Sequence, residues 1–453
     1  MFEPQILNDF IFEHCNKSMD NALSAERYPL WKRSCPELSD IDFICLGILR
    51  CISSVDSGRH FLQTAEEIHD EQCPLSTYFK SLKSARRVSM LEAVEQQSYD
   101  LYRETLSTHG IDYLKSFPEL NDYTVLAADG HFIDHACHTE KGRNGKVYTA
   151  GFIYALNLRN GLLSPFSLIT NGTRRHQEIP VLRNQLNRQN RTKNSTEKCL
   201  YVYDKAVTDY AFWNNQIEHG NLMISVLKEN SVATFVESIP FDTSHEINTG
   251  VENYSIYENN GIRFSIVNYR DPETRKLHHF VTTLPGSINP GTVAMLYYKR
   301  WTIEKAFNNS KSNLKEIKAW SSDNNSLKNQ MRLTAMSYNL LRMVEEPSKT
   351  QDPELIHPSD KKYTEALEKR QQTAQKRGGF VNPLFFNERI TRISSYTIRA
   401  FQNAILIRKS LSSFINALVA KLVPRVHQVG GTLMILVLTR IKKGAINAPF
   451  NLD

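Results

Sequence analysis

Short apolar runs separated by helical patterns occupy the middle of the chain from about residue 122 onward. Runs of this length, rich in β-branched and aromatic residues, predict buried strands, whereas apolar positions three or four residues apart predict helices. The predicted elements are three strands, then helix, strand, helix and strand: 123–128, 147–158, 162–170, 176–189, 199–203, 208–219 and 222–227. This order predicts an α/β fold, a mixed sheet with helices on its faces.

The region before this sheet, 1–120, has a helical pattern. One helix is expected to end near Asp70, and a second to begin near Ser76. The Cys73-Pro74 pair between them marks a turn, because proline disfavours helix in the residue before it. Basic residues surround the apolar positions of the second helix, as in a DNA-binding helix-turn-helix. Two ordinary packed helices with solvated charges would give the same pattern, so both interpretations stay open.

The pattern changes again after the predicted sheet. Residues 228–288 are polar and strand-like, which predicts a β-rich insertion. Helical patterns follow at 292–311 and 327–344. The segment 346–361 is polar, contains three prolines and lacks a period, which predicts a linker. The last segment, 362–453, is predicted to be a basic helical region.

Composition and charge narrow the class of protein. The chain is 41% hydrophobic and 23% charged, which is typical of a globular protein. The net charge is +7, but residues 361–453 alone hold sixteen Lys or Arg against four acids. Such a local basic segment favours a polyanionic partner. Neither a G-x-x-x-x-G-K-[ST] loop nor a G-x-G-x-x-G turn occurs, so a nucleotide-driven motor is not supported.

The cysteines, the apolar runs and the N-terminal segment indicate in which cellular compartment the protein is expected. Seven widely spaced cysteines without a C-x-x-C pair favour reduced thiols over a disulfide framework or a four-cysteine zinc site. The longest apolar run, 433–438, is far shorter than the about 20 residues that cross a bilayer, and the acidic N-terminus does not resemble a signal peptide. We therefore expect a cytoplasmic protein without membrane contact.

Two aspartates follow apolar runs that are predicted to be strands. Asp129 ends the first predicted strand and Asp204 ends the fourth. In a sheet of this order these strands can be neighbours, and both carboxylates would then point into one crevice. Either aspartate alone can be a helix cap or turn former. A close pair repels unless a cation is present, and Mg²⁺ takes carboxylate oxygens while keeping water and phosphate oxygens as other ligands.

The helix predicted after the insertion offers a third acid. Tyr297, Arg300, Glu304 and Lys311 are spaced at intervals that place them on one helical face. Charged rows of this kind are often ordinary ion-pair stripes. A carboxylate between two cations, with an aromatic beside it, also suits a site that binds metal and phosphate together.

These residues resemble the motifs of a known family. The spacing Y-x2-R-x3-E-x6-K resembles the YREK signature of a large group of bacterial insertion-sequence DDE transposases. The sequence D-G-x-F at Asp129 is similar to the first-Asp motif of that group. The sequence D-K-x-x-x-D at Asp204 is similar to the second, with Lys205 in place of the usual arginine and Val207 in place of the glutamate. The resemblance covers about 120–345, half of the chain.

The resemblance implies a ribonuclease-H-like mixed sheet with flanking helices across 121–345, with the β-rich insertion between the second aspartate and the glutamate. It implies that Asp129, Asp204 and Glu304 hold two Mg²⁺ (or Mn²⁺) ions. The implied activity is cleavage of the ends of an insertion sequence and their joining to target DNA by two-metal phosphoryl transfer. The implied partners are terminal inverted repeats, target DNA and a second copy of the chain in a synaptic homodimer. The implied location of the DNA-bound protein is the bacterial nucleoid.

Further residues are expected to contact DNA. The fork of Arg300 and the point charge of Lys311 suit phosphates. Trp301 could stack on an extruded base, or be a core tryptophan. The basic stretch 174–198 is either a DNA path or a solvated helix face. The predicted DNA-binding set is Tyr297, Arg300, Trp301, Lys311, Lys205, Arg174 and Arg175.

Three histidines, His131, His135 and His138, invite a zinc interpretation. Their segment is predicted to be strand and hairpin, and strand alternation puts the third on the opposite face from the first two. A zinc site is therefore not expected there.

Two other functions remain open on the same fold. One is a DNA-binding regulator whose catalytic activity has decayed. The other is a metal-dependent nuclease that cuts DNA without strand transfer. The intact set of three acids favours the transposase over the regulator.

Overall fold

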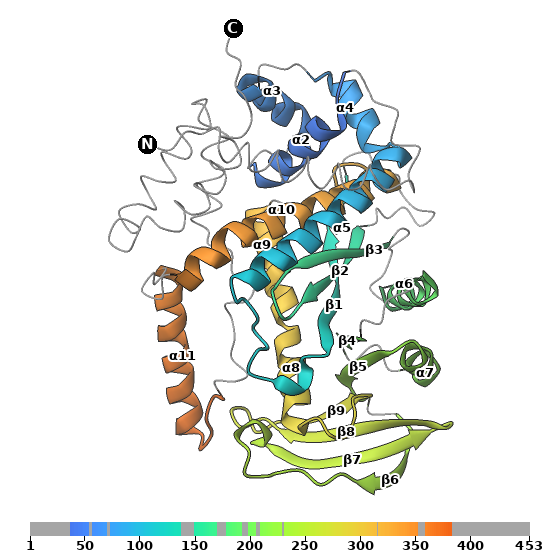
Figure 1. Ribbon diagram of the computed structural model, residues 1–453. Coiled ribbons are helices and arrows are strands. Elements are labelled where there is room, and N and C mark those ends of the chain that lie inside the picture. The colour runs from blue at the N-terminus through green and yellow to red at the C-terminus, as the bar shows by residue number, and fades with distance from the viewer. Residues whose placement is uncertain are drawn as a thin grey trace.

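The structure is a computed structural model with a long central sheet and helices on both of its faces (Figure 1). Of the residues expected to contact DNA, Arg174, Arg175 and Lys205 lie outside the part that the structure describes, as do His138 and most of the basic tail. The described residues are 37–53, 57–69, 73–136, 149–169, 178–192, 198–204, 209–228, 231–314, 316–351 and 358–382.

Nine strands in the described part of the chain form one mixed sheet, in the order β3-β2-β1-β4-β5-β9-β8-β7-β6. The first five strands and two helices follow the predicted order, so the mixed α/β fold is confirmed. β4 pairs in parallel with both β1 and β5, whereas the other neighbours are antiparallel. The strands are β1 (Tyr123–Ile133), β2 (Ala150–Asn157), β3 (Leu163–Ile169), β4 (Lys198–Val202), β5 (Asn221–Val226), β6 (Thr234–Ser238), β7 (Val251–Asn259), β8 (Ile262–Arg270) and β9 (Leu277–Thr282).

The strands of the predicted insertion extend the same sheet. β9 pairs with β5, and β8, β7 and β6 follow outward, so that β6 is the edge strand. The insertion therefore continues the core sheet, and its hydrogen bonds tie it directly to the strand that follows β4.

Helices cover the two faces of the sheet with two separate cores. On one face, α6 (Glu178–Thr192) and α7 (Tyr210–Glu218) bury Leu186 and Trp213 against the sheet. The larger core on the other face includes the buried residues of three later helices. These helices are α8 (Pro290–Arg300), α9 (Thr302–Asn313) and α10 (Asn324–Gln351).

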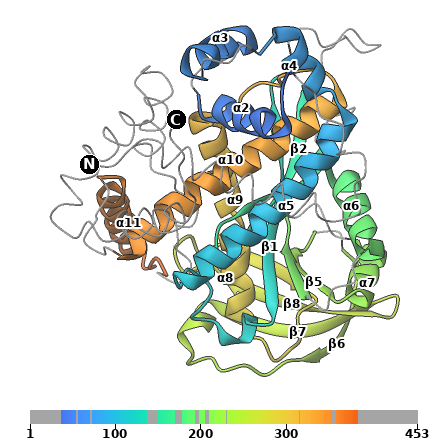
Figure 2. The same cartoon turned by 45° about the horizontal axis from the view of Figure 1, so that its top comes forward.

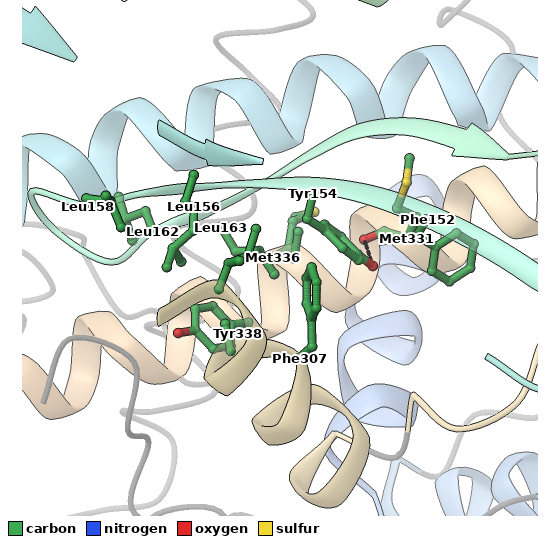
Figure 3. Packing of buried hydrophobic residues seen from close by; sticks show 14 of the residues in the cluster. Phe152, Tyr154, Leu156, Leu158, Leu162, Leu163, Phe307, Met331, Met336 and Tyr338 are labelled. Carbon is green, nitrogen blue, oxygen red and sulfur yellow. Dashed lines mark hydrogen bonds between the residues drawn. The ribbon is translucent and has the colours of Figure 1, made fainter. Parts of the chain in front are cut away.

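Strand alternation sorts the side chains of β1 and β2 between the two cores. Val125 and Ala127 belong to the larger core, and Ala128 belongs to the smaller one. Figure 3 shows the larger core where β2 and β3 pack on α9 and α10, with Tyr154 pointing toward the helices. The hydroxyl oxygen of Tyr154 lies 3.3 Å from the carbonyl oxygen of Met331 on α10.

The N-terminal helices pack through α10 on the half of the chain that contains the sheet. Figures 1 and 2 both show α5 lying along α10, and the larger core continues from α2 and α4 into α10. The expected turn at Cys73-Pro74 separates α3 from α4. The N-terminal helices are α2 (Asp40–Ile52), α3 (Gly58–His69), α4 (Leu75–Leu82) and α5 (Ala85–Thr108).

The basic residues around α4 divide into two groups. Arg86 forms an ion pair with Asp40, and Arg87 is buried and donates to a backbone carbonyl. Lys80 and Lys83 are exposed. Only the two lysines are therefore placed to meet a DNA backbone, and DNA binding by this region stays a prediction.

The expected linker at 346–361 is helical in its described parts. α10 continues to Gln351 with Pro347 inside it, and α11 (Pro358–Lys376) begins at a proline. α11 contacts the turn between β8 and β9, where Arg370 pairs with Glu273 at 2.6 Å. None of the helices in the described ranges is both long and apolar enough to cross a membrane.

Candidate active site

The first two acids of the predicted triad lie near the carboxyl ends of two neighbouring strands. β1 and β4 are parallel neighbours, and their last paired residues are Ala127 and Val202. Asp129 and Asp204 each lie two residues further along. The neighbouring strands expected from the sequence are therefore present, and they bring both aspartates to one place.

Asp129 does not end its strand, contrary to expectation. β1 continues to Ile133, because β2 pairs with it beyond the point where β4 has ended. At Asp129 the backbone of β1 is therefore paired with β2 on one side and is no longer paired with β4 on the other. Its own Oδ1 accepts a 2.9 Å hydrogen bond from the backbone N–H of Gly130.

Arg300, the last residue of α8, joins two acids. One terminal nitrogen of its guanidinium lies 3.2 Å from Asp129 Oδ2, and the other lies 3.5 Å from Glu304 Oε1. Its side chain is 5% exposed, against 22% for Asp129 and 44% for Glu304. A single buried planar cation thus reaches both carboxylates, and they lie no further apart than one guanidinium can span.

Glu304 stands in the first turn of α9, where the helix dipole favours a negative charge. Burial raises the pKa of its carboxyl above the ordinary value. The nearby Arg300 opposes this shift of the pKa, and the charges of Asp129 and Asp204 add to it. Glu304 therefore lies within electrostatic range of both aspartates of the predicted triad.

The helix that was predicted across 292–311 is two helices. α8 ends at Arg300 and α9 begins at Thr302, with Trp301 between them. Trp301 keeps helical backbone angles, but its N–H bonds the carbonyl of Tyr298, three residues back, at 3.2 Å. The break turns the exposed indole, 62% accessible, outward beside Arg300. Trp301 is therefore not a core tryptophan.

Tyr297 lies against the same cluster from α8. Its hydroxyl is 3.4 Å from Asp204 Oδ1, and the Arg300 guanidinium lies 5.6 Å from its ring centroid. Burial raises the pKa of the Tyr297 hydroxyl, Arg300 lowers it and Asp204 raises it. Lys311, expected on the same face, lies in the last turn of α9 with an exposed side chain.

The three carboxylates offer oxygen donors of the kind that Mg²⁺ and Mn²⁺ prefer. In the described ranges, no three His, Cys, Asp or Glu side chains are drawn together closely enough to coordinate one ion. Arg300 lies between Asp129 and Glu304 and offsets one of their two negative charges. The donor set thus fits a hard divalent cation by its chemistry.

A family model for the transposase DDE domain matches residues 120–340, the region that contains the sheet, the three acids, α8, α9 and the first part of α10. Residues 120–340 are a transposase DDE domain. The match confirms the resemblance of this half of the chain to insertion-sequence DDE transposases. Among curated proteins, no sequence matches the chain significantly.

One arginine of the basic stretch 174–198, which was a candidate DNA path, holds two helices of the DDE domain together. Asp209, the second acid of the D-K-x-x-x-D motif, caps α7 by accepting from the N–H of Phe212. It also pairs with Arg183 at 2.6 Å, and the Arg183 guanidinium lies over the Phe212 ring. Arg183 therefore anchors α6 to α7. The other predicted contacts, Arg174, Arg175 and Lys205, lie outside the described residues.

One buried pair in the DDE domain was missed by sequence reasoning. His131 is 1% exposed and lies 3.1 Å from Glu316, which is 0% exposed. His135 is exposed, so the two histidines described do not converge on one ion. The signal that could have found His131 is its place two residues after Asp129, on the same face of the strand. Glu316 stands in a segment without a period and gave no such signal.

Proposed function

We propose that this protein is a DNA transposase of the YREK group. It cleaves the ends of an insertion sequence and joins them to target DNA by phosphoryl transfer. The observation that carries the proposal is that Arg300 pairs with both Asp129 and Glu304, next to the contact of Tyr297 with Asp204, inside a DDE domain. Carboxylates beside a buried arginine suit a centre that binds metal ions and phosphate together.

The proposal gives different roles to the acids and to Arg300 and Tyr297. Asp129, Asp204 and Glu304 would hold two Mg²⁺ (or Mn²⁺) ions, which when bound supply activation of the attacking oxygen and stabilisation of the leaving oxygen. Arg300 and Tyr297 orient the scissile phosphate at this edge of the sheet. No covalent bond between protein and DNA is needed, because a water or a DNA 3′-hydroxyl attacks the phosphate directly.

The DNA partners follow from the same proposal. The protein binds the terminal repeats of its own element and a target duplex, and two copies pair the two ends. Lys311, exposed at the end of α9, contacts a phosphate beside the scissile one. We include Lys205, Arg174 and Arg175 in the DNA path because their charges lie next in sequence to the second acid and to α6.

The experiment that tests the proposal uses a plasmid that carries the gene with its flanking DNA. Purified protein with Mg²⁺ is expected to cut at short inverted repeats on both sides of the gene, and chelation should stop the cutting. DNA binding without any cut would favour the decayed regulator. Cuts without joined products would favour the nuclease.

Trp301 is expected to act on the DNA and not on the fold. Because its indole is 62% exposed, Trp301→Ala should leave the melting temperature nearly unchanged. Stacking on a base is worth about 1–3 kcal/mol, so cleavage of a fully paired end should slow by roughly 5- to 150-fold. Trp301→Phe, which keeps a stacking ring, should recover much of the rate. Equal rates for Trp301→Ala and wild type would remove the stacking role.

The basic tail is expected to supply DNA affinity. Residues 383–453 hold ten Lys or Arg against two acids, and a chain ending at Asn382 keeps the contact of α11 with the turn between β8 and β9. Loss of the tail should weaken binding and flatten its dependence on salt, because fewer counterions are released from DNA. The measurement is a binding titration at several salt concentrations. An unchanged slope of affinity against salt would show that the tail does not bind DNA.

A further inference from the structure

A buried histidine connects the strand that carries Asp129 to the helix that carries Glu304. His131 follows Asp129 by two residues on β1, so both side chains lie on the face covered by α9. Its ring centroid is 4.8 Å from that of Phe307. Phe307 follows Glu304 by three residues, about one helical turn, on α9. The histidine therefore lies between the two elements that supply these acids.

Glu316 fixes the histidine from its other side. Its Oε2 is 3.1 Å from His131 Nε2, and its Oε1 accepts a 2.7 Å hydrogen bond from the Tyr154 hydroxyl. Tyr154 is the residue directly opposite Asp129 on β2. The nitrogen and Oε2 are in close contact without the alignment of a hydrogen bond. A fully buried carboxylate is costly, so contacts that hold it on both oxygens strongly restrict its position.

The backbone around Glu316 continues the same connection. The N–H of Asp134 donates to the carbonyl of Ile317 at 2.7 Å, and the N–H of Ala319 donates to the carbonyl of Asp134 at 2.8 Å. Residues 316–319 thus lie along the end of β1, beyond the last residue that β4 covers. Glu316 comes three residues after the end of α9. The segment therefore ties the far end of α9 back to β1.

We propose that His131 and Glu316 are positioning residues that set the spacing of the Asp129 and Glu304 carboxylates, and with it the affinity of the site for a divalent cation. This inference rests on the proposed function, in which these carboxylates share metal ions. Neither residue touches the ions or DNA: His131 acts through β1, and Glu316 acts through the segment after α9. Errors of about 1 Å in such a site are costly to binding and catalysis.

Two substitutions remove the imidazole–carboxylate contact and preserve the packing. His131→Phe keeps a ring against Phe307 and removes the nitrogen that faces Glu316. Glu316→Gln keeps an oxygen to accept from Tyr154, and it decides the question if His131→Phe does not fold. The matched control is Asn339→Ala. Asn339 is also buried, and its amide bonds both the N–H and the carbonyl of Leu163, on elements that carry no acid of the triad.

The test is a Mn²⁺ titration of the full chain, in which the paramagnetic resonance signal of free Mn²⁺ reports binding. We expect His131→Phe and Glu316→Gln each to weaken Mn²⁺ binding about tenfold, as losing supporting contacts of a metal site does. The double variant should be no weaker than the single ones, because the two residues act as a unit. Asn339→Ala should lower the melting temperature and keep the wild-type Mn²⁺ affinity.

The outcomes separate this inference from the proposed function. Unchanged Mn²⁺ affinity in both variants, equal weakening in Asn339→Ala, or no Mn²⁺ binding by the wild type overturns the positioning role. Cleavage of end DNA is measured on the same samples. A wild type that binds Mn²⁺ more tightly than His131→Phe but never cuts DNA supports the positioning role and refutes the transposase function.

Discussion

Replacing any one acid of the triad with its amide is expected to abolish cleavage of the element's ends and to spare DNA binding. Asp129→Asn, Asp204→Asn and Glu304→Gln each remove a charge with almost no change in volume. In the proposed mechanism the bound metal ions stabilise the transition state by several kcal/mol. Because each variant loses a metal ligand, the rate should fall about 1,000-fold or more. End binding should stay within about threefold, because phosphate contacts elsewhere supply most of the affinity.

The measurement is single-turnover cleavage of a pre-bound end duplex in Mg²⁺, with a binding titration beside it. Glu258→Gln is the control, since this acid lies on β7 in the insertion and pairs with the exposed Arg263. It should cleave at the wild-type rate. A triad variant that cleaves as fast as this control does not lack a metal ligand, and its residue would have to be removed from the triad.

Arg300→Lys is expected to slow the chemical step about 100-fold while changing affinity little. Lysine keeps the charge but has no fork, so it cannot reach Asp129 and Glu304 together as the guanidinium does. Removing one donor that stabilises a transition state typically costs about 100- to 1,000-fold in rate. Because Arg300 is buried, the melting temperature of the variant must be measured alongside its rate.

One control variant and one contrasting variant are measured beside Arg300→Lys. Arg270→Lys changes a half-buried arginine that pairs with Glu252 on the insertion, and it should leave the rate unchanged. Lys311→Ala should weaken end binding and blur the cut position more than it slows cleavage, because Lys311 is exposed at the far end of α9. If Arg300→Lys cleaves at the wild-type rate, or Lys311→Ala changes neither affinity nor cut position, the roles given to these two cations are wrong.

Local patterns predicted the core sheet because its strands are short, buried and bounded by turns. The order of strands and helices from β1 to β5 follows directly from apolar runs in the sequence, and the parallel pairing of β1 with β4 places Asp129 beside Asp204. The spacing of Tyr297, Arg300 and Glu304 was also informative, because it is set by helical geometry that survives the break between α8 and α9.

The features that the sequence did not predict depend on hydrogen bonds and contacts that local patterns do not encode. Trp301 has helical backbone angles, so nothing in its local sequence marks the change of hydrogen bonding that separates α8 from α9. Pro347 suggested a linker, but α10 continues through it to Gln351. Glu316 meets Tyr154 from 162 residues away, a contact that no local period encodes.

The most direct test of the account is to sequence the joints formed when the protein, Mg²⁺, a fragment bearing the element's two ends and a target plasmid are incubated together. The account predicts products in which each terminal repeat is joined directly to target sequence, formed by the wild type and absent with Glu304→Gln. Ends that are cut but never joined, or joints that Glu304→Gln forms equally well, would contradict it.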